Sequence, residues 1–300
     1  MPIPYQVVEE TARQMYGRAL KKYPPDLVKC LRSAAKAETN PVAQKHFQLM
    51  VASIEKGEQK DQPICQDTGM QTLWIKAGTN MQFNGQKVQD AIRNGVRRWS
   101  SENEYRKTVV HPVTRAKVGE QVGLRHPTIY WDFLEGKDYL EMMMLSKGSG
   151  SENQGFLAML VPAQGINGVK QFIIDSVLAA GGQFCPPGVA GVGIGGTFDS
   201  VARMAKEALL RPLDTRNPDP KIAELEDELL EAINATGIGP MGLGGKTTVF
   251  KVNVEYGVTH ETQNPVALNL QCWAHRKAGA RIHSDGRVEY IDYFGGEAHE

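Results

Sequence analysis

Three of the four cysteines lie in polar or glycine-rich junctions, where a thiol could take part in chemistry. Cys65 precedes Gln66 and Asp67, Cys185 precedes two prolines and a run of glycines, and Cys272 opens the segment CWAHR. Thiolates are common ligands of zinc and of iron–sulfur clusters. The sequence has no C-x-x-C pair, so spacing alone leaves the question of a metal open. Cysteines that are simply small buried hydrophobic residues are the alternative.

The fourth cysteine, Cys30, has a different setting. Leu27, Cys30, Leu31 and Ala34 follow the i, i+3, i+4, i+7 pattern of one helix face, so we expect Cys30 to pack in a core and to be chemically inert. Four cysteines this widely scattered do not form a disulfide scaffold, and the N-terminus lacks the pattern of a signal peptide. We therefore expect a reducing, cytoplasmic compartment.

Two glycine-rich runs could bind anions. The run 191–196 satisfies G-x-G-x-x-G, and Asp214 follows near the position of a ribose-binding acid, which would indicate a dinucleotide site. Two prolines upstream and no clear βαβ unit favour instead a close-packed glycine turn leading into a helix at Ser200, whose free N–H groups could hold an anion. The run KGSGSEN (147–153) could present N–H groups to a carboxylate, or be an ordinary flexible turn.

The composition is that of a folded protein with no marked charge. Of 300 residues, 34 are Lys or Arg and 34 are Asp or Glu, which argues against a nucleic-acid or membrane-surface binder. Hydrophobic residues make up 41%, which is enough for a sizeable core. The uncharged run 176–198 contains seven glycines and two adjacent prolines, so it could not form a continuous membrane-spanning helix.

Hydrophobic periodicity predicts the elements that must position these residues. We expect helices in the N-terminal third and later at 169–176, 201–209 and 222–233, and a loop at 63–69 ahead of a strand at 72–77. Further strands are predicted at 140–146, 158–161, 248–256 and 266–272. The fold class is therefore α/β (mixed α+β), with a single large domain over 1–282 and a polar C-terminal tail over 283–300.

Six motifs, in order along the chain, carry a resemblance to a known family. The motifs are PICQDTG (63–69), KGSGSEN (147–153), CPPGVAGVGIGGT (185–197), ALLRP (208–212), IGPMGLGG (238–245) and CWAHR (272–276). Together they are similar to the α subunit of the class I (iron–sulfur) hydro-lyases, which are the two-subunit fumarate hydratases and L-tartrate dehydratases. The resemblance covers roughly residues 5–282.

The resemblance implies a cofactor and a partner. It implies a [4Fe–4S] cluster held by Cys65, Cys185 and Cys272, with glycine-rich strand–helix junctions around it. Three protein ligands would leave one iron open to bind substrate oxygen as a Lewis acid, whereas four would suit an electron carrier. The resemblance also implies a separate β subunit that completes the site, an α2β2 assembly, and no activity from this chain alone.

It further implies roles for individual residues. Asp67 would be a proton-transfer residue, Gln66 a hydrogen-bond donor to substrate, and Gly148 an N–H donor to a carboxylate. His260 resembles an active-site histidine that orients the leaving hydroxyl or moves a proton. Arg106 is a looser match for a carboxylate-binding arginine.

Structural alternatives accompany these roles. An aspartate in a D-T-G loop often only closes an Asx turn, and a histidine between strands is usually a surface or packed residue. Because the segment around Arg106 departs from the family pattern, Arg97, Arg98 or Lys107 could serve in its place.

The activity expected from the resemblance is the reversible hydration of fumarate to malate. Fumarate is favoured by the form of the KGSGSEN loop, and the alternatives are an L-tartrate dehydratase or another small-dicarboxylate hydratase such as a mesaconase. A nucleotide-binding oxidoreductase or a binding protein built on the G-x-G-x-x-G run is the alternative from a different class.

Overall fold

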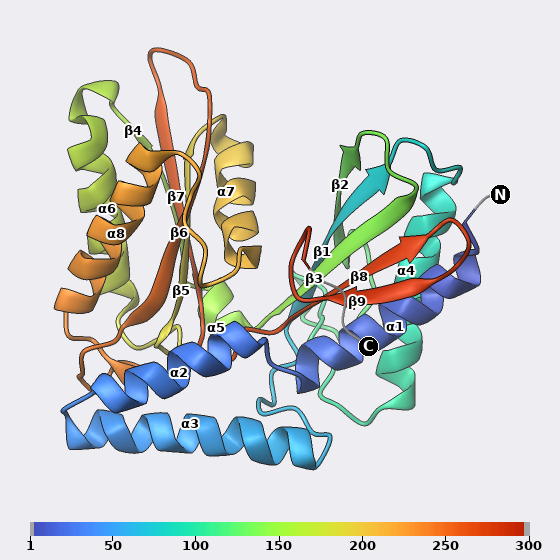
Figure 1. Cartoon of the computed structure of the whole chain (residues 1–300), viewed down its shortest axis with the longest axis horizontal. Coiled ribbons are helices and arrows are strands. Elements are labelled where there is room, and N and C mark those ends of the chain that lie inside the picture. Colours follow the sequence, from blue (N-terminus) through green and yellow to red (C-terminus); the bar gives the residue numbers. More distant parts are fainter. Residues whose placement is uncertain (1–2, 297–300) are drawn as a thin grey trace. The chain divides into compact units, whose positions relative to one another are not determined.

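The computed structural model describes residues 3–296, which form two compact units (Figure 1). The described part of unit 1 consists of residues 3–23, 57–148 and 276–296, and unit 2 consists of residues 24–56 and 149–275. Each unit has its own mixed sheet and its own helices. The predicted mixed α and β fold class is therefore confirmed.

Unit 1 contains a five-stranded sheet with the strand order β2-β1-β3-β8-β9. Strands β1 and β2 are parallel, and the other neighbours are antiparallel. The elements are α1 (Tyr5–Lys21), β1 (Met70–Gly78), α4 (Gly85–Glu102), β2 (Thr128–Leu134), β3 (Tyr139–Lys147), β8 (Lys277–His283) and β9 (Val288–Ile291).

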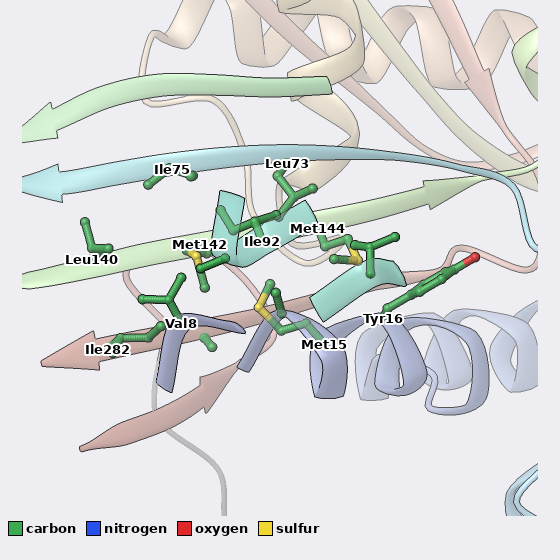
Figure 2. Close-up of a cluster of buried hydrophobic side chains, with 14 of the residues drawn as sticks. Val8, Met15, Tyr16, Leu73, Ile75, Ile92, Leu140, Met142, Met144 and Ile282 are labelled. Carbon is green, nitrogen blue, oxygen red and sulfur yellow. The ribbon is translucent and has the colours of Figure 1, made fainter. Parts of the chain in front are cut away.

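Helices α1 and α4 cover one face of this sheet and bury its core (Figure 2). Met15 and Tyr16 of α1 pack with Ile92 of α4 against Leu73 and Met144 of the sheet. Each such side chain contributes about 1.5–3 kcal/mol when it is fully buried. The hydrophobic stripes of the two helices therefore fix them on the strands that lead to the candidate site.

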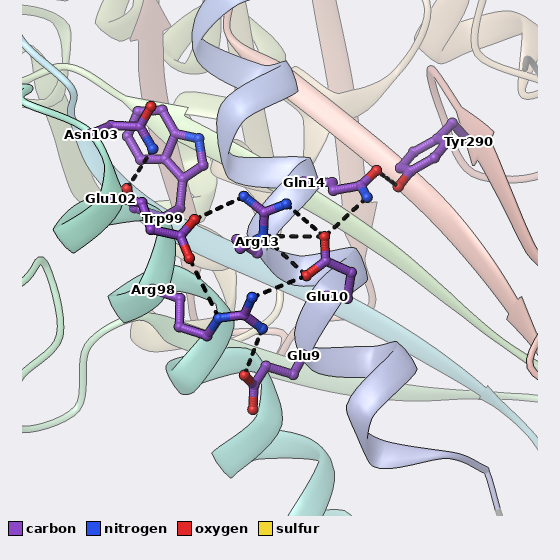
Figure 3. Close-up of polar contacts among 9 residues, drawn as sticks. All are labelled: Glu9, Glu10, Arg13, Gln14, Arg98, Trp99, Glu102, Asn103 and Tyr290. Carbon is purple, nitrogen blue, oxygen red and sulfur yellow. Dashed lines mark hydrogen bonds and ion pairs between the residues drawn. The ribbon is translucent and has the colours of Figure 1, made fainter.

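A network of ion pairs joins the exposed sides of the same two helices (Figure 3). Arg13 of α1 contacts Glu10 at 2.6 Å and Glu102 of α4 at 2.9 Å, and Arg98 of α4 contacts Glu9 at 2.9 Å. The hydrogen bonds from Arg13 are the main reason why the pKa of Glu10 is lowered to about 2. Partly exposed pairs of this kind contribute only about 0–1 kcal/mol each, so the buried stripes rather than the ion pairs hold α1 and α4 together.

Unit 2 contains a four-stranded sheet with the order β4-β7-β5-β6, in which β5 is parallel to β6 and antiparallel to β7. Helix α7 packs on one face, and α6 and α8 pack on the other (Figure 1). The elements are α2 (Pro25–Ala37), most of α3 (Pro41–Gln59), α5 (Ser149–Glu152), β4 (Gly155–Leu160), α6 (Gly165–Ala180), β5 (Gly188–Gly195), α7 (Phe198–Glu207), α8 (Pro220–Ala235), β6 (Val249–Gly257), β7 (Asn264–Gln271) and the 3-10 turns η1 (Pro162–Gln164), η2 (Ala208–Leu210) and η3 (Pro240–Gly242).

The G-x-G-x-x-G run differs from its expected form, because most of it is strand rather than turn. Gly191 and Gly193 lie in β5, directly under α7. A Cβ atom would lie 2.1 Å from the Ala205 carbonyl oxygen at position 191, and 2.3 Å from the Val201 carbonyl oxygen at position 193. These glycines therefore allow close packing of strand and helix, and only the last part of the run makes the turn.

The predicted boundary at residue 282 falls inside β8, and residues 288–291 of the expected polar tail form β9. Strand β9 pairs with β8, and Ile291 is only 2% exposed. Unit 1 pairs strands from distant parts of the chain, and the expected single domain over 1–282 stays a prediction. Such long-range pairing leaves no local composition signal at which a boundary could be read.

Cys30 lies on α2, next to the buried Leu27 and Leu31, but is itself only half-buried. Burial is the main cause that raises the pKa of its thiol. A raised thiol pKa lowers the thiolate fraction, which agrees with an inert residue.

Candidate active site

The candidate site in unit 1 lies at one edge of its sheet, where β1 begins, β3 ends and β8 begins. Met70 of β1 pairs with Lys147 of β3, and Leu145 pairs with Lys277 of β8. The Ser146 N–H donates to the Arg276 carbonyl oxygen at 2.9 Å. The loop 63–69, the glycine turn at 148 and the start of β8 therefore meet at this edge.

Asp67 closes a turn and also faces Gly148. Its Oδ1 accepts a hydrogen bond from the Gly69 N–H at 2.8 Å, so the Asx-turn alternative is present in the structure. The Arg276 guanidinium donates to the Asp67 backbone carbonyl oxygen. A Cβ atom at position 148 would lie 3.1 Å from Asp67 Oδ2 and 2.8 Å from Arg276 Nη2. The turn thus directs the second carboxylate oxygen toward the buried glycine.

A pocket of about 440 Å³ opens beside the same loop in unit 1. Cys65, Gln66, Thr68 and Arg106 are among the residues that line it. The Thr68 hydroxyl donates to the Arg106 carbonyl oxygen at 2.8 Å, which fixes the Arg106 backbone against the loop. Gln66 and Arg106 are exposed, and Cys65 is half-buried, so all three are accessible to a small ligand.

The other cations considered for the arginine role are engaged elsewhere. Arg98 pairs with Glu9 in the α1–α4 network, and Arg97 donates to Asn94 at 2.6 Å on α4. Lys107 lies 3.5 Å from Glu120. Of the four candidates, Arg106 alone lines this pocket.

A buried polar network lies behind the loop. The side-chain amide of Gln71, which is fully buried, donates to the Gly69 carbonyl oxygen at 3.1 Å. The Ser146 hydroxyl donates to the Thr68 carbonyl oxygen at 2.6 Å, and Gln121 also donates to the Gly69 carbonyl oxygen at 3.2 Å. Buried hydrogen bonds of this kind rigidify the backbone that they hold, so the backbone on either side of Asp67 is fixed.

His126 belongs to this network. It is buried, and desolvation lowers its pKa to about 4, so the imidazole is neutral near pH 7. Its Nε2 lies 3.2 Å from Gln71 Oε1 and donates to it, because the Gln71 amide nitrogen already faces the loop carbonyls. Neither residue carried a motif in the sequence; only long-range folding assembles them.

In unit 2, three of the motifs come together around Cys185. Its carbonyl oxygen accepts a hydrogen bond from the Trp273 N–H at 3.2 Å, which places it beside the residue that follows Cys272. The Met241 N–H donates to the Pro186 carbonyl oxygen at 2.8 Å. Cys185 itself has φ = +56°, an uncommon backbone conformation for a non-glycine residue that often accompanies functional sites.

Gly188 controls how closely the Cys185 and Cys272 segments approach. A Cβ atom there would lie 1.7 Å from the Gln271 carbonyl oxygen. We predict that Gly188→Ala lowers the free energy of unfolding by about 1–3 kcal/mol, since β5 and β7 must separate. Urea denaturation measures this, with Gly257→Ala as the control, because a Cβ at 257 has only ordinary contacts. Equal stability of the two variants would contradict the predicted steric conflict.

His260 lies away from these thiols within unit 2. It is exposed in the turn between β6 and β7, where its Nδ1 lies 2.9 Å from the Thr262 hydroxyl. Strand β7 separates it from Cys272, and eight strand residues span roughly 26 Å. The structure therefore does not bring His260 together with Cys185 and Cys272, and its role in proton transfer stays a prediction.

Most of the chain matches one family. A model of the fumarate hydratase (Fumerase) family matches residues 9–281. The chain belongs to this family. The predicted resemblance and the enzyme class that it implied, a hydro-lyase, are confirmed.

Relatives of this Fumerase-family chain match it over nearly their full length. A Methanocaldococcus jannaschii protein named "Putative L(+)-tartrate dehydratase subunit alpha" is 38% identical over 94% of this chain and 99% of its own length. The L(+)-tartrate dehydratase subunit alpha of Escherichia coli, in strains UTI89 and K12, is 30% identical over 91% of this chain and 89% of its own length.

No disulfide joins the four cysteines of this Fumerase-family chain; Cys65 lies in unit 1, and Cys185 and Cys272 lie in unit 2. Over residues 3–296, no three His, Cys, Asp or Glu side chains gather as a set of metal ligands. No helix in the described range is both long and apolar enough to cross a membrane.

Arg276 is the site residue that the sequence analysis missed in this Fumerase-family chain. It ends the CWAHR motif, and its side chain is only 1% exposed. The signal in the sequence that could have pointed to Arg276 is its place in CWAHR, a motif that was singled out because it begins with Cys272. Its contact with Asp67 could not be read from the sequence, because the two residues are 209 positions apart.

Proposed function

We propose that this chain is the α-type subunit of an iron–sulfur hydro-lyase that reversibly adds water to fumarate. The observation that carries the proposal is the arrangement in unit 1, where Asp67 faces Gly148 beside a pocket lined by Cys65, Gln66 and Arg106. A proton-transfer carboxylate next to N–H and cationic donors suits chemistry adjacent to a carboxylate, where negative charge builds up.

Each of these residues has a role in the proposal. The Gln66 amide, the Gly148 N–H and the Arg106 guanidinium bind and orient the substrate carboxylates. Asp67 Oδ2 takes up or delivers the proton at the carbon next to a carboxylate. The buried network of Gln71, Ser146 and Gln121 keeps the loop from shifting when the charge on Asp67 changes.

The chemistry of the three cysteines supports a cluster. Cys65, Cys185 and Cys272 form no disulfide and are half-buried, and partly exposed thiolates of this kind can serve as ligands of iron. When bound through these three residues, a [4Fe–4S] cluster would supply a Lewis-acidic iron for a substrate oxygen. Cysteines outside disulfides and an oxygen-sensitive cluster both suit the reducing cytoplasmic compartment that we propose.

L-tartrate is the second candidate substrate, because the relatives that match this chain over most of their length carry the name of L(+)-tartrate dehydratase. Both candidates are small dicarboxylates that the same donors could bind. Steady-state assays with fumarate, malate, L-tartrate and mesaconate distinguish them. The alternative from a different class, a nucleotide-binding protein, would be recognised by two other observations, because it would be colourless and would retain a bound nucleotide.

We further propose that a β subunit completes the site, as the name "subunit alpha" of the relatives suggests. A dianion in a water-poor site needs several charged or N–H contacts, because burying charge without partners is costly. Gln66, Gly148 and Arg106 supply only part of that set. The donors still missing would come from the β subunit in an α2β2 assembly.

We predict that the purified α chain, loaded with iron and sulfide under anaerobic conditions, is inactive until the β chain is added. Activity should rise linearly with added β and saturate at a one-to-one ratio. The measurement is fumarate hydration in a titration of cluster-loaded α with β. Full activity of α alone would overturn the proposed division of roles between the subunits.

A further inference from the structure

Arg276 has the largest fully buried side chain of residues 3–296, and it is a charged one. Burying a guanidinium is costly unless its donors find acceptors. Its Nε has no hydrogen-bond partner among the described residues. An apolar side chain would fill the same space at a lower cost in free energy than a buried guanidinium with an unsatisfied donor. Stability alone therefore does not account for an arginine at position 276.

The Arg276 guanidinium contacts the Asp67 loop. One guanidinium nitrogen, Nη1, donates to the Asp67 backbone carbonyl oxygen. The other, Nη2, lies 2.8 Å from the position that a Cβ atom at residue 148 would occupy. Asp67 Oδ2 lies 3.1 Å from the same place. Gly148 is therefore the point on which the arginine and the carboxylate converge.

Backbone pairing fixes Arg276 in turn. Its carbonyl oxygen accepts from the Ser146 N–H at 2.9 Å, and Lys277, the next residue, pairs with Leu145 at the start of β8. The guanidinium is thus attached to the rigid sheet, while Asp67 lies on a loop ahead of β1. A planar fork on a rigid element can set the position of a loop in a way that a flexible ammonium cannot.

We propose that Arg276 is a positioning residue for Asp67 in the hydration reaction. Its fork holds the Asp67 backbone and, with Gly148, keeps Oδ2 directed at the substrate. This inference rests on the proposed function and adds a residue to it. It also explains why position 148 carries no side chain: a Cβ atom would displace the guanidinium.

The test compares Arg276→Lys and Arg276→Gln with Arg281→Lys and Arg281→Gln in the anaerobically loaded αβ complex. Arg281 is a matched control, because it is a partly buried arginine of β8, the strand that begins directly after Arg276, and it pairs with Glu141 at 2.8 Å and Glu289 at 3.1 Å. We expect both Arg276 variants to lose about 10²-fold in kcat per bound cluster, with KM within about threefold, because misplacing a catalytic group by an ångström costs that much. The Arg281 variants should keep the wild-type kcat per cluster.

Dividing kcat by the iron content separates positioning from folding, since a purely structural residue would change only the fraction of loaded protein. A kcat per cluster equal to that of the Arg281 variants would overturn the proposal. A loss confined to KM would overturn it as well, because Arg276 would then act by binding substrate. If the Arg276 variants do not fold, Gly148→Ala should reproduce the loss of kcat by displacing the guanidinium, and normal turnover of that variant would contradict the proposal.

A second readout does not depend on activity. The Gly69 amide donates to Asp67 Oδ1, so its hydrogen exchange reports whether the carboxylate is in place. In the purified chain we expect exchange in the segment 66–70 to be at least about tenfold faster in the Arg276 variants than in the Arg281 variants. Unchanged exchange would refute the hold of Arg276 on Asp67. Inactivity of the wild-type complex would refute the proposed function instead.

Discussion

Replacing Cys65, Cys185 or Cys272 by serine is expected to remove bound iron and to abolish hydro-lyase activity, whereas Cys30→Ser should keep both. Iron binds the thiolate, and serine supplies no equivalent ligand at neutral pH. Loss of a Lewis acid that contributes several kcal/mol should lower activity by about 10³-fold or more. Iron and sulfide per chain, measured after anaerobic reconstitution, are the primary readout.

Cys30 is a demanding control, because it is half-buried like the other three cysteines. It differs in lying on α2 beside buried leucines, where burial raises the pKa of its thiol. If Cys30→Ser lost the iron while one of the other three variants retained it, the proposed set of ligands would be wrong.

Asp67→Asn is expected to lower kcat by about 10²–10⁴-fold with the cluster intact, which is the usual contribution of a proton-transfer group. Asparagine keeps the side-chain oxygen that can accept from the Gly69 N–H, so the turn should survive. It removes the basicity of the second oxygen, which faces Gly148. Turnover and iron content are measured on the same samples.

The control for this variant is Asp61→Asn. The carboxylate of Asp61 is mostly exposed, and it pairs with Lys21 at 2.7 Å. It should retain wild-type turnover, since an exposed pair of this kind contributes little. Normal turnover of Asp67→Asn would leave Asp67 with the turn as its only role.

The elements whose signal is local could be predicted from the sequence. Helix α4 was predicted from the hydrophobic stripe formed by Val88, Ile92, Val96 and Trp99, and strand β3 was predicted from the apolar run at 140–146. The loop 63–69 was predicted because it is dense in polar residues just before a strand, and the structure places it at the candidate site. In each case a few neighbouring residues determine the result.

Features that depend on distant residues were not predictable in this way. The glycines at 191 and 193 fit a turn by composition, but α7 packs against them and requires a strand without side chains. Arg276 meets Asp67 only because β1, β3 and β8 pair across the whole chain. His260 is a further case. Only twelve residues separate it from Cys272, but because those residues include a complete strand, their separation in the sequence does not tell how far apart the two side chains lie.

Hydration of fumarate by the anaerobically reconstituted αβ complex, followed in parallel with iron content, shows whether this chain is part of an iron-dependent hydro-lyase. We predict that the loss of fumarate and the appearance of malate scale with bound iron across preparations of different loading, and that both stop on exposure to oxygen. A complex with full iron content that converts none of fumarate, malate, L-tartrate or mesaconate would contradict the proposed hydro-lyase function.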